Sequence, residues 1–318
     1  MGQRQGNSPD GIIEGVNHDG PSRTALGAAT HRAAHQVLDD ARIFRDRLAV
    51  PILPDAQMAI EEAQAHPERR RLRLFIAGRH RIFEDLAEQQ STLGPAQVVV
   101  LGAGLDTFAY RHAATPDLHV WEVDHPASQA WKRIRLADAG IPVPGNLDFV
   151  GVDFETDDLA AELEKAGVDR TLPVVFGWLG VVPYLTRAAI TQTLEVIADH
   201  PGALAVFDYA NPTADLAEQS RRRRQDDLAR VAAVGEPWIS FFDTEELHAV
   251  LRRRGLAVIE DLGPADFGAR FFGLPAGPQR PGGHILVARG PTPGRGEDNL
   301  TLKGRTVRPP ARHRQDSG

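Results

Sequence analysis

Five short apolar runs alternate with helical segments between residues 97 and 210, and this alternation limits the possible folds more than any other feature. Nearly continuous apolar strands that are separated by helices indicate a parallel sheet covered on both faces. Because such crossovers are right-handed, the sequence predicts a doubly wound α/β fold. The runs are QVVVLG (97–102), LHVWEVD (118–124), LDFVGVDF (147–154), PVVFGWLGV (173–181) and GALAVFDYA (202–210).

Two further strands follow the fifth run. Residues 211–238 form a polar, amphipathic insertion, and residues 243–255 have the pattern of a helix. LAVIEDLG (256–263) and GGHILVARG (282–290) then resemble strands, with no long crossover helix expected between them. We therefore expect an antiparallel pair that completes a mostly parallel sheet of seven strands.

The remaining segments define the expected domain organisation. Residues 21–92 repeat apolar positions at three-to-four spacing and predict an N-terminal helical lid. The lid and the sheet core (97–289) are expected to form one domain, 21–289. Residues 1–20 are polar and glycine-rich, which is typical of a flexible arm. Residues 290–318 are rich in Pro, Gly and Arg and predict a disordered tail.

Composition excludes several classes of function. The chain has no cysteine, so disulfides, thiolate metal sites and a cysteine nucleophile are absent. A net charge of −7 gives no general attraction for nucleic acid or an anionic membrane. No apolar run approaches the roughly 20 residues that span a bilayer, and the N-terminus lacks the regions of a signal peptide. We expect a cytoplasmic protein with a small-molecule partner and no metal, while its oligomeric state stays open.

The turn after the first strand, in VVVLGAGLDTFAYRH (98–112), is the first candidate site. Gly102 and Gly104 lie where ligands bind in open α/β sheets, beyond the carboxyl ends of the strands. Glycine there permits unusual φ values and removes a Cβ that would block a ligand. Asp124 ends the second strand, with Glu122 two residues earlier, and an acid at this place commonly binds ribose hydroxyls. The pattern indicates a cofactor that contains adenosine.

Asp106 distinguishes between such cofactors. The dinucleotide pattern G-x-G-x-x-G places a third glycine three residues after the second, where this chain has Thr107. Asp106, beside it, is an acid that would repel a diphosphate. S-adenosylmethionine carries a sulfonium and an ammonium group and no phosphate, so an acid near the turn is compatible with it. A simpler role for Asp106 or Thr107 is to cap the next helix. An NAD(P)-dependent oxidoreductase is the alternative function.

Several segments resemble the leucine carboxyl methyltransferase family, which includes the tetracenomycin-type polyketide O-methyltransferases. They are QVVVLGAGLDTFAYR, VWEVDHPASQAWKR, FVGVDFETDDLAAEL and FGWLGVVPYLT, and the resemblance covers roughly residues 21–289. It implies the class I methyltransferase sheet of seven strands and the cofactor S-adenosylmethionine. It also implies methyl transfer to the oxygen of a small-molecule carboxylate or hydroxyl. Methylation of a protein phosphatase terminus is suggested by the family name alone.

The resemblance also implies roles for individual residues. Arg79, with Arg81 as second choice, would bind the methionine carboxylate. The glycine turn, including Ala103, would lie against the cofactor, and Asp124 would bind the ribose. Asp153 and Phe154 would bracket the adenine. Many members have a glutamate facing the methionine ammonium where this chain has Leu179. Backbone carbonyls near Gly177 or Gly102 would then supply acceptors, and a non-catalytic protein that binds S-adenosylmethionine is a further alternative.

An acceptor pocket is expected above the ends of the fourth and fifth strands. Core packing explains each candidate aromatic side chain equally well. A carboxylate acceptor needs no general base, whereas a hydroxyl would benefit from one. The arginine run 221–224 is most simply a solvated helix face, but beside the pocket it would attract an anionic acceptor. The candidate pocket residues are Trp178, Tyr184 and Tyr209, with Pro183 and Asn211, and the candidate bases are His125, Tyr184, His112 and His80.

Overall fold

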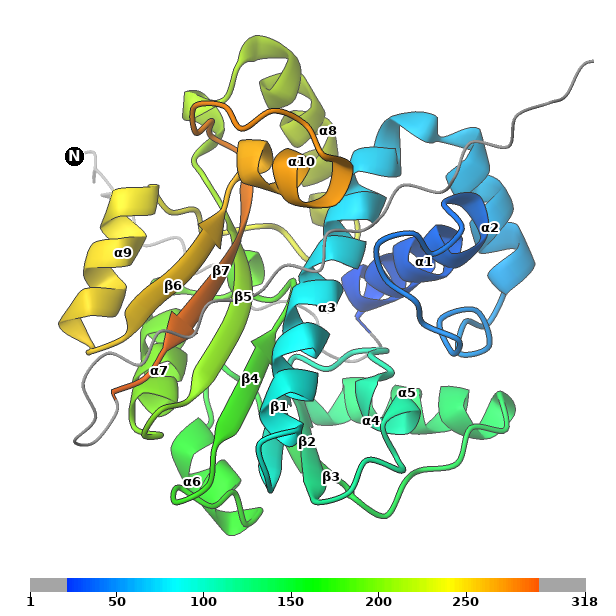
Figure 1. Ribbon diagram of the computed structural model, residues 1–318. Coiled ribbons are helices and arrows are strands. Elements are labelled where there is room, and N and C mark those ends of the chain that lie inside the picture. The colour runs from blue at the N-terminus through cyan, green and yellow to red at the C-terminus, as the bar shows by residue number, and fades with distance from the viewer. Residues whose placement is uncertain (1–21, 292–318) are drawn as a thin grey trace, which may run out of the picture.

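The computed structural model describes residues 22–291, and its centre is a seven-stranded sheet (Figure 1). The strand order is β3-β2-β1-β4-β5-β7-β6, and only β7 runs antiparallel to its neighbours. This confirms the predicted doubly wound α/β class with an antiparallel last pair. The predicted arm 1–20 and residues 292–318 of the predicted tail lie outside the described residues. The strands are β1 (Ala96–Leu101), β2 (Leu118–Asp124), β3 (Leu147–Gly151), β4 (Val174–Trp178), β5 (Leu204–Ala210), β6 (Ala257–Leu262) and β7 (Gly283–Arg289).

The order of the strands reverses between β1 and β4. Val100 of β1 pairs with Glu122 of β2 on one side and with Gly177 of β4 on the other. The carboxyl ends of β2, β1, β4 and β5 therefore lie in one row. In open α/β sheets, ligands bind at this kind of switch point.

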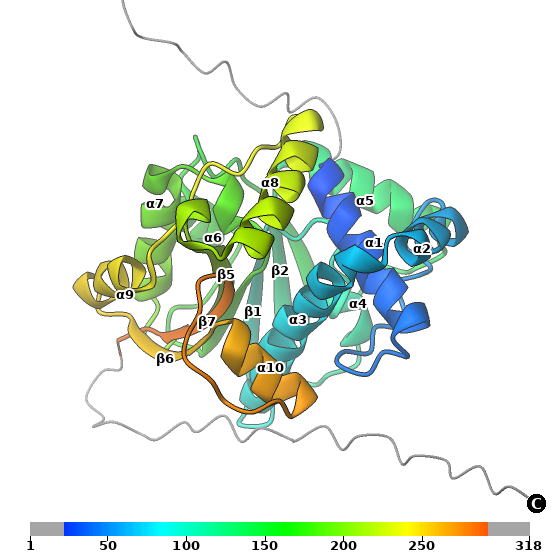
Figure 2. The ribbon, with the colours of Figure 1, turned by 90° about the horizontal axis from the view of Figure 1, so that it is seen from above.

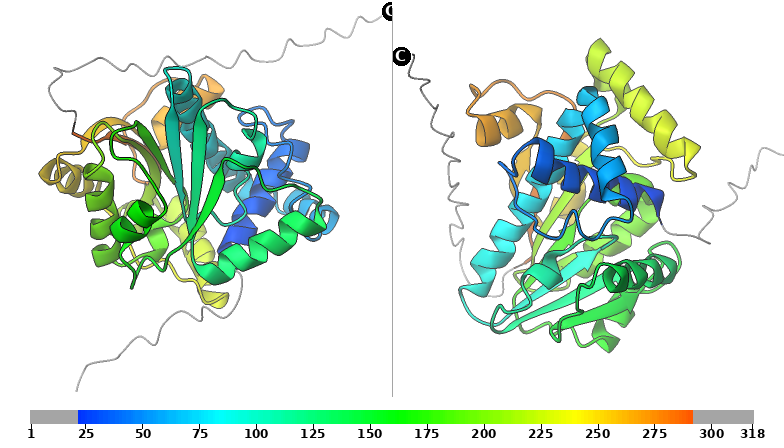
Figure 3. Two further views of the ribbon diagram at one scale, coloured as in Figure 1. Left: turned by 90° about the horizontal axis from the view of Figure 1, so that it is seen from below. Right: turned by 90° about the vertical axis from the view of Figure 1, so that its right-hand side faces the viewer.

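Helices cover both faces of the sheet (Figure 3). One core cluster includes Phe176 and Phe207 with residues of α6 (Leu159–Lys165), α7 (Arg187–Ala198) and α9 (Thr244–Arg253). The other includes Val98 and Val206 with residues of α3 (Arg70–Ser91), α4 (Phe108–Arg111) and α5 (Pro126–Asp138). Alternate side chains of each central strand enter opposite clusters, as expected for a strand buried on both sides.

The N-terminal helices were expected to form a lid, but one of them packs directly on the sheet. The N-terminal segment contains α1 (Arg23–Leu38), α2 (Ala56–Ala65), η1 (Pro67–Arg69) and α3. Phe83 of α3 lies directly over Gly177, where a Cβ would come within 2.6 Å of its ring. The second half of α3 therefore belongs to the sheet core. α1 packs Ala29 and Ala33 against the same cluster, and its first turn covers the glycine turn.

The upper ends of the central strands are surrounded by helices from distant parts of the chain (Figure 2). These are α1, α3, α8 (Glu218–Ala233) from the predicted insertion, and α10 (Pro264–Phe272). The sequence did not predict α10, which interrupts the β6–β7 connection and packs Phe267 against Gly78 of α3. Short η2 (Val182–Tyr184) and η3 (Thr213–Asp215) turns complete this end. Within residues 22–291, no helix combines the length and apolar character needed to span a bilayer.

Candidate functional site

The turn after β1 requires glycine at two positions. Gly102 has φ +65 and Gly104 has φ +46, a left-handed region that strains other residues. A Cβ on Gly102 would also overlap the Val181 side chain. The Gly102 N–H donates to the Val123 carbonyl at 2.8 Å, so the turn closes over the end of β2. This fixes the predicted cofactor turn beside the predicted ribose acid.

Asp124 lies against this turn at the end of β2. Its Oδ2 accepts the Gly104 N–H at 2.6 Å and its Oδ1 accepts the His125 N–H at 2.7 Å. Each carboxylate oxygen keeps a further lone pair that could accept a ribose hydroxyl. Burial raises the pKa of Asp124, although the two backbone N–H donors and Lys132 oppose this shift. The backbone of the turn thus orients the carboxylate, and its ribose contact stays a prediction.

Asp106 points inward, away from the open side of the turn. It is 6% exposed, and its Oδ1 accepts the Phe108 N–H at 2.7 Å at the start of α4. Its Oδ2 lies 3.3 Å from Nδ1 of His80. Burial alone would raise the pKa of Asp106, but His80 and nearby cations hold it well below its usual range. The geometry favours the helix-capping role and leaves any effect on the cofactor indirect.

Glu122 forms an ion pair in the core beneath the turn. Its Oε2 lies 2.6 Å from Nζ of Lys132, and both residues are 1% exposed. Burial raises the pKa of Glu122 to about 7, although Lys132 opposes the shift. We conclude that Glu122 supports β2 and α5 from below, which gives it a partner other than the expected ribose.

Arg79 lies across the ends of β4 and β5. It is 6% exposed and its NH1 donates to Oδ2 of Asp208 at 3.0 Å. Oδ1 of Asp208 accepts the Gly180 N–H at 2.6 Å, and a Cβ at Gly180 (φ +74) would lie 2.5 Å from the guanidinium. Nε of Arg79 is buried and has no hydrogen-bond partner among residues 22–291. Arg81 instead pairs with Asp85 at 2.7 Å on a partly exposed face, so Arg79 is the better candidate for a carboxylate contact.

Asp208 is the acidic residue that sequence reasoning missed at this site. It is 5% exposed, and the carboxylate joins α3 to the end of β4 through Arg79 and Gly180. The sequence does contain a signal for this residue, namely an acid within the apolar run GALAVFDYA. A buried strand rarely contains a charged residue without a partner, so a cation could have been expected nearby. Leu179 itself packs, partly buried, against the cluster beneath α3.

Gly177 has a packing role. The residue lies within β4 between Val100 and Val206, and Phe83 fills the space above it. Packing against Phe83 therefore explains why position 177 is a glycine. The contact with the cofactor that was expected there is not needed for this explanation.

Asp153 and Phe154 follow the end of β3, next to Asp124. The register pairs Gly151 with Asp124, which places this turn beside the predicted ribose site. Oδ1 of Asp153 accepts the Glu155 N–H at 3.0 Å, and Phe154 packs, partly buried, against the cluster beneath α6 and α7. The adenine contacts stay predictions.

Trp178 and Tyr209 require a correction, because neither lines an open pocket. Trp178 is 0% exposed and Tyr209 is 2% exposed, and both belong to the cluster beneath α6, α7 and α9. The Tyr209 hydroxyl donates to Oδ2 of Asp261 at 2.7 Å, and its ring stacks on His284. Because side chains alternate along a strand, Tyr209 points away from the face that Asp208 occupies.

Tyr184 is the predicted pocket aromatic that lies partly exposed at this end of the sheet. Its ring meets the edge of Trp238 at 6.3 Å between centroids. Burial raises the pKa of Tyr184, while the side chains of Trp238 and Thr24 oppose the shift. His125, another of the four candidate bases, caps α5, where its Nδ1 accepts the Ala127 N–H at 3.2 Å.

A residue from the end of the insertion holds α1 over the glycine turn. The Glu236 carboxylate accepts the backbone N–H groups of Arg23 at 2.7 Å and Thr24 at 3.1 Å, and the hydroxyls of Thr24 and Ser22. Ala25 approaches Gly104 so closely that a Cβ there would lie 3.0 Å from its own Cβ. The N-terminus of α1 therefore covers the predicted cofactor turn.

A buried ionic network fixes the rest of α1 to the same turn. Arg32 donates to Oδ2 of Asp46 at 3.0 Å and to the Leu105 carbonyl at 2.6 Å. Asp46 also accepts the Thr107 hydroxyl at 2.7 Å and lies 3.2 Å from Arg111. None of these long-range partners was recognisable from spacing in the sequence.

Among residues 22–291, the fold assembles one trio of possible metal ligands that sequence spacing did not suggest. The ligand atoms of Glu84, Glu88 and His112 lie within 4.8 Å of one another. Glu84, however, forms a bidentate ion pair with Arg111. Its carboxylate is therefore already neutralised by a fixed cation, and the expectation of no metal stays a prediction.

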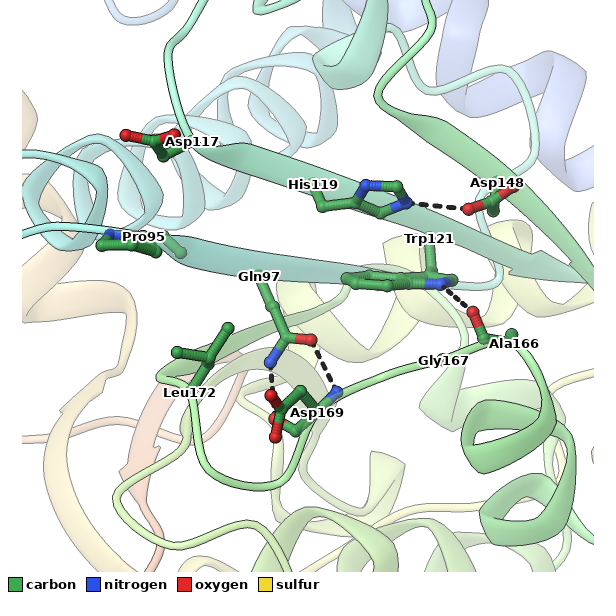
Figure 4. A pocket seen from close by; sticks show the side chains of 11 residues that line it. Pro95, Gln97, Asp117, His119, Trp121, Asp148, Ala166, Gly167, Asp169 and Leu172 are labelled. Atoms are coloured by element: carbon green, nitrogen blue, oxygen red, sulfur yellow. Dashed lines mark hydrogen bonds and ion pairs between the residues drawn. The ribbon is translucent and has the colours of Figure 1, made fainter.

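A cavity of about 310 Å³ lies at the opposite, amino edge of the sheet (Figure 4). Gln97 exchanges two hydrogen bonds of 2.7 Å with the backbone of Asp169 there. The Trp121 indole donates to the Ala166 carbonyl at 3.0 Å. These polar groups are paired with one another, and none of the predicted site residues lines this cavity.

The chain is similar to known methyltransferases. A family model described as leucine carboxyl methyltransferase matches residues 25–198. The Bacillus subtilis protein YktD is 33% identical over 280 residues, which cover 79% of this chain and 91% of that protein. A protein from Rhodococcus jostii is 34% identical over 60% of this chain and 66% of its own length. The names of both assign them provisionally to the S-adenosyl-L-methionine-dependent methyltransferases.

A solved structure supports the fold alone. It is a duf574 family protein from Streptomyces avermitilis, with 14% identity and a TM-score of 0.51 over 87% of this chain and 100% of that one. The family model covers more than half of the chain, and the relative from B. subtilis covers most of it at 33% identity. This protein therefore belongs to the leucine carboxyl methyltransferase family.

Proposed function

We propose that this protein transfers a methyl group from S-adenosylmethionine to an oxygen atom of a small-molecule acceptor. Family membership makes it a methyltransferase that depends on S-adenosylmethionine. The oxygen and the small acceptor are our proposal. The observation that carries it is the convergence of Arg79, Asp124 and the glycine turn at the switch point of the sheet.

The residues at this edge fit the parts of the cofactor. The unpartnered Nε of Arg79 can donate to the methionine carboxylate. Asp124, oriented by two backbone N–H groups, can accept the ribose hydroxyls. Asp153 and Phe154 offer a carboxylate for the adenine amine and an apolar face for its ring. When bound, S-adenosylmethionine supplies a methyl carbon on a cationic sulfur, which an oxygen lone pair attacks in line as the carbon–sulfur bond breaks.

The chain itself contributes alignment and exclusion of water. Glu236 holds the start of α1 over the glycine turn, which shields this part of the site from solvent. The candidate bases are largely engaged: His125 caps a helix, and burial lowers the pKa of His80 to about 4 although Asp106 opposes this. An acceptor oxygen that is already anionic, as in a carboxylate, needs no base and suits this environment. A net charge of −7 favours a small molecule over nucleic acid or an anionic membrane as partner.

The first experiment is calorimetric titration with S-adenosylmethionine and S-adenosylhomocysteine, with NADH as the control. We expect micromolar binding of the first two and no binding of NADH. Transfer of a labelled methyl group to a panel of phenols and carboxylates then tests the oxygen acceptor. Binding of NADH instead would support an oxidoreductase. Cofactor binding without transfer to any oxygen acceptor would favour a non-catalytic binding protein, which the replacement of the family glutamate by Leu179 also suggests.

A further inference from the structure

The ion pair between Arg79 and Asp208 leaves hydrogen-bonding positions unfilled on both of its members. NH1 of Arg79 donates to Oδ2 of Asp208 at 3.0 Å. Nε of Arg79 is buried and has no partner among residues 22–291. The Asp208 oxygens accept the N–H groups of Arg79 and Gly180, one each, and every carboxylate oxygen has a second lone pair. The pair can therefore offer a donor and acceptors to one ligand.

Burial makes these unfilled positions costly. The side chains of Arg79 and Asp208 are each 8% exposed, so water has little access to them. A buried ion pair offsets its desolvation only when further hydrogen bonds satisfy its remaining protons and lone pairs. Most buried polar groups of native proteins do have a partner. An incomplete pair at the switch point of the sheet thus points to a ligand that completes it.

The pair is joined to the glycine turn by direct contacts. The Gly180 N–H donates to Oδ1 of Asp208 at 2.6 Å, and a Cβ on Gly180 would lie 2.5 Å from NH2 of Arg79. The next residue, Val181, packs so closely on Gly102 that a Cβ there would overlap its side chain. Two successive residues after β4 therefore contact the ion pair and the cofactor turn, which places the pair beside the turn.

The cofactor brings two charges to this place. The methionine part of S-adenosylmethionine carries its ammonium and its carboxylate on the same carbon atom. Whatever binds the carboxylate therefore has the ammonium close by, and a buried cation requires an acceptor. Leu179, which precedes Gly180, is apolar and packs, partly buried, against the cluster beneath α3. Among the described residues, Asp208 is the carboxylate that lies within 4 Å of Arg79.

The other acids near the turn have different positions. Asp106 points inward, where it accepts the Phe108 N–H at 2.7 Å and lies 3.3 Å from His80. Asp124 ends β2, on the opposite side of β1 from β4 and β5, and the proposed function assigns it to the ribose. Asp208 therefore fits the ammonium better than either of them.

We propose that Asp208 binds the ammonium of the cofactor's methionine part, while Arg79 binds the carboxylate on the same carbon. Because the Arg79 contact belongs to the proposed function, the ammonium contact rests on that proposal and extends it. Two opposite charges side by side are complementary to an α-amino acid. A carboxylate also forms a stronger hydrogen bond with an ammonium than the backbone carbonyls expected near Gly177 or Gly102 would. Asp208 thus supplies the acceptor that Leu179 lacks.

The test removes each charge from the ligand in turn. Calorimetry on the full chain compares S-adenosylhomocysteine with two analogues. The 3-carboxypropyl thioether of 5′-thioadenosine lacks the ammonium, and the 3-aminopropyl thioether lacks the carboxylate. Wild type should lose at least about tenfold in affinity with either analogue, the scale of one charge-assisted contact. In Asp208→Asn, loss of the ammonium should cost less than about twofold, because its partner is already gone, whereas loss of the carboxylate should still cost about tenfold.

Two further variants serve as controls. Asp208→Glu keeps the charge and should retain part of the ammonium dependence. Asp261→Asn is the matched control, because the Asp261 side chain is also 8% exposed and ends the neighbouring part of the sheet, but it pairs with His248 and His284. It should behave as wild type with all three ligands.

The outcomes separate binding from mere positioning of Arg79. If Asp208 only held Arg79 in place, Asp208→Asn would reduce the cost of losing the carboxylate and leave the cost of losing the ammonium unchanged, which would overturn the inference. Equal effects of Asp208→Asn and Asp261→Asn would do the same. Wild type alone can also overturn it, if loss of the ammonium leaves the affinity unchanged. Failure of wild type to bind S-adenosylhomocysteine would instead overturn the proposed function.

Discussion

The two edges of the central sheet differ in how their polar groups are satisfied. The amino edge contains the cavity of about 310 Å³, in which Gln97 pairs with Asp169 and Trp121 with Ala166 (Figure 4). The carboxyl edge contains buried arginine donors, such as Nε of Arg79, that have no partner among the described residues. The polar groups in the amino-edge cavity are thus bonded to one another, whereas the carboxyl edge keeps buried donors without acceptors within residues 22–291.

This difference shows which observations indicate a site. Unsatisfied buried donors cost stability, so those that persist in a native structure require an explanation such as a bound ligand. A hollow lined by mutually bonded groups follows from packing alone. Substitutions at the carboxyl edge should therefore change ligand binding. Substitutions at the amino edge should leave ligand binding unchanged and affect stability alone.

The largest effect is expected for Arg79→Leu at the carboxyl edge. We expect S-adenosylhomocysteine affinity to fall by about a hundredfold, or about 2.7 kcal/mol, because the proposed carboxylate contact is lost. Stability should also fall by roughly 3 kcal/mol, because Asp208 keeps a buried charge without its partner. Calorimetry and urea unfolding measure the two effects.

The double variant Arg79→Leu/Asp208→Leu separates these effects. It removes both charges, so it should recover much of the stability and none of the affinity. Wild-type affinity in either variant would show that the methionine carboxylate binds elsewhere.

Asp124→Ala should weaken S-adenosylhomocysteine binding by at least about tenfold, or about 1.4 kcal/mol, the scale of a charge-assisted hydrogen bond. Its matched control is Asp148→Ala, which removes an acid of the amino-edge cavity and should leave the affinity unchanged. Equal affinities in the two variants would contradict the proposed contact of Asp124 with the ribose. They would also weaken the contrast between the carboxyl and amino edges of the sheet.

Acidification should destabilise the carboxyl edge through His31. Its pKa is lowered to about 4 from 6.5 by burial and then by the arginines around it, so the unfolded chain binds a proton more readily between these values. The free energy of unfolding should therefore fall as the pH falls from about 6.5 to about 4. His31→Gln removes this titration, and urea unfolding across that range should show a shallower decline. An identical decline in both proteins would contradict the assignment.

The smallest effect is expected for His119→Ala at the amino edge. Its 2.8 Å contact with Asp148 joins side chains that are 40% and 58% exposed. Exposed pairs of this kind contribute less than about 1 kcal/mol, so unfolding free energy should change little. S-adenosylhomocysteine affinity should stay at the wild-type value, and a measurable loss would mean that the two edges are coupled.

Much of the fold could be predicted because the relevant signals are local. Apolar runs and helical spacing located all seven strands within a few residues. α10 was missed although its apolar residues are strongly periodic, because it is only nine residues long and Pro264, Gly268 and Gly273 are typical of a turn. Trp178 and Tyr209 were misplaced because a strand buried on both faces gives no alternation to orient its side chains.

Local sequence patterns are enough to place the strands and helices along the chain, the glycine turn and the acid that ends β2. These depend on backbone conformation and spacing along short stretches of chain. Long-range packing brings Arg79 to Asp208, 129 residues later, and places Arg224 over the Trp238 ring while Arg222 faces solvent. Such contacts depend on which helix crosses which strand end, and that choice minimises buried charge and exposed apolar surface over the whole molecule.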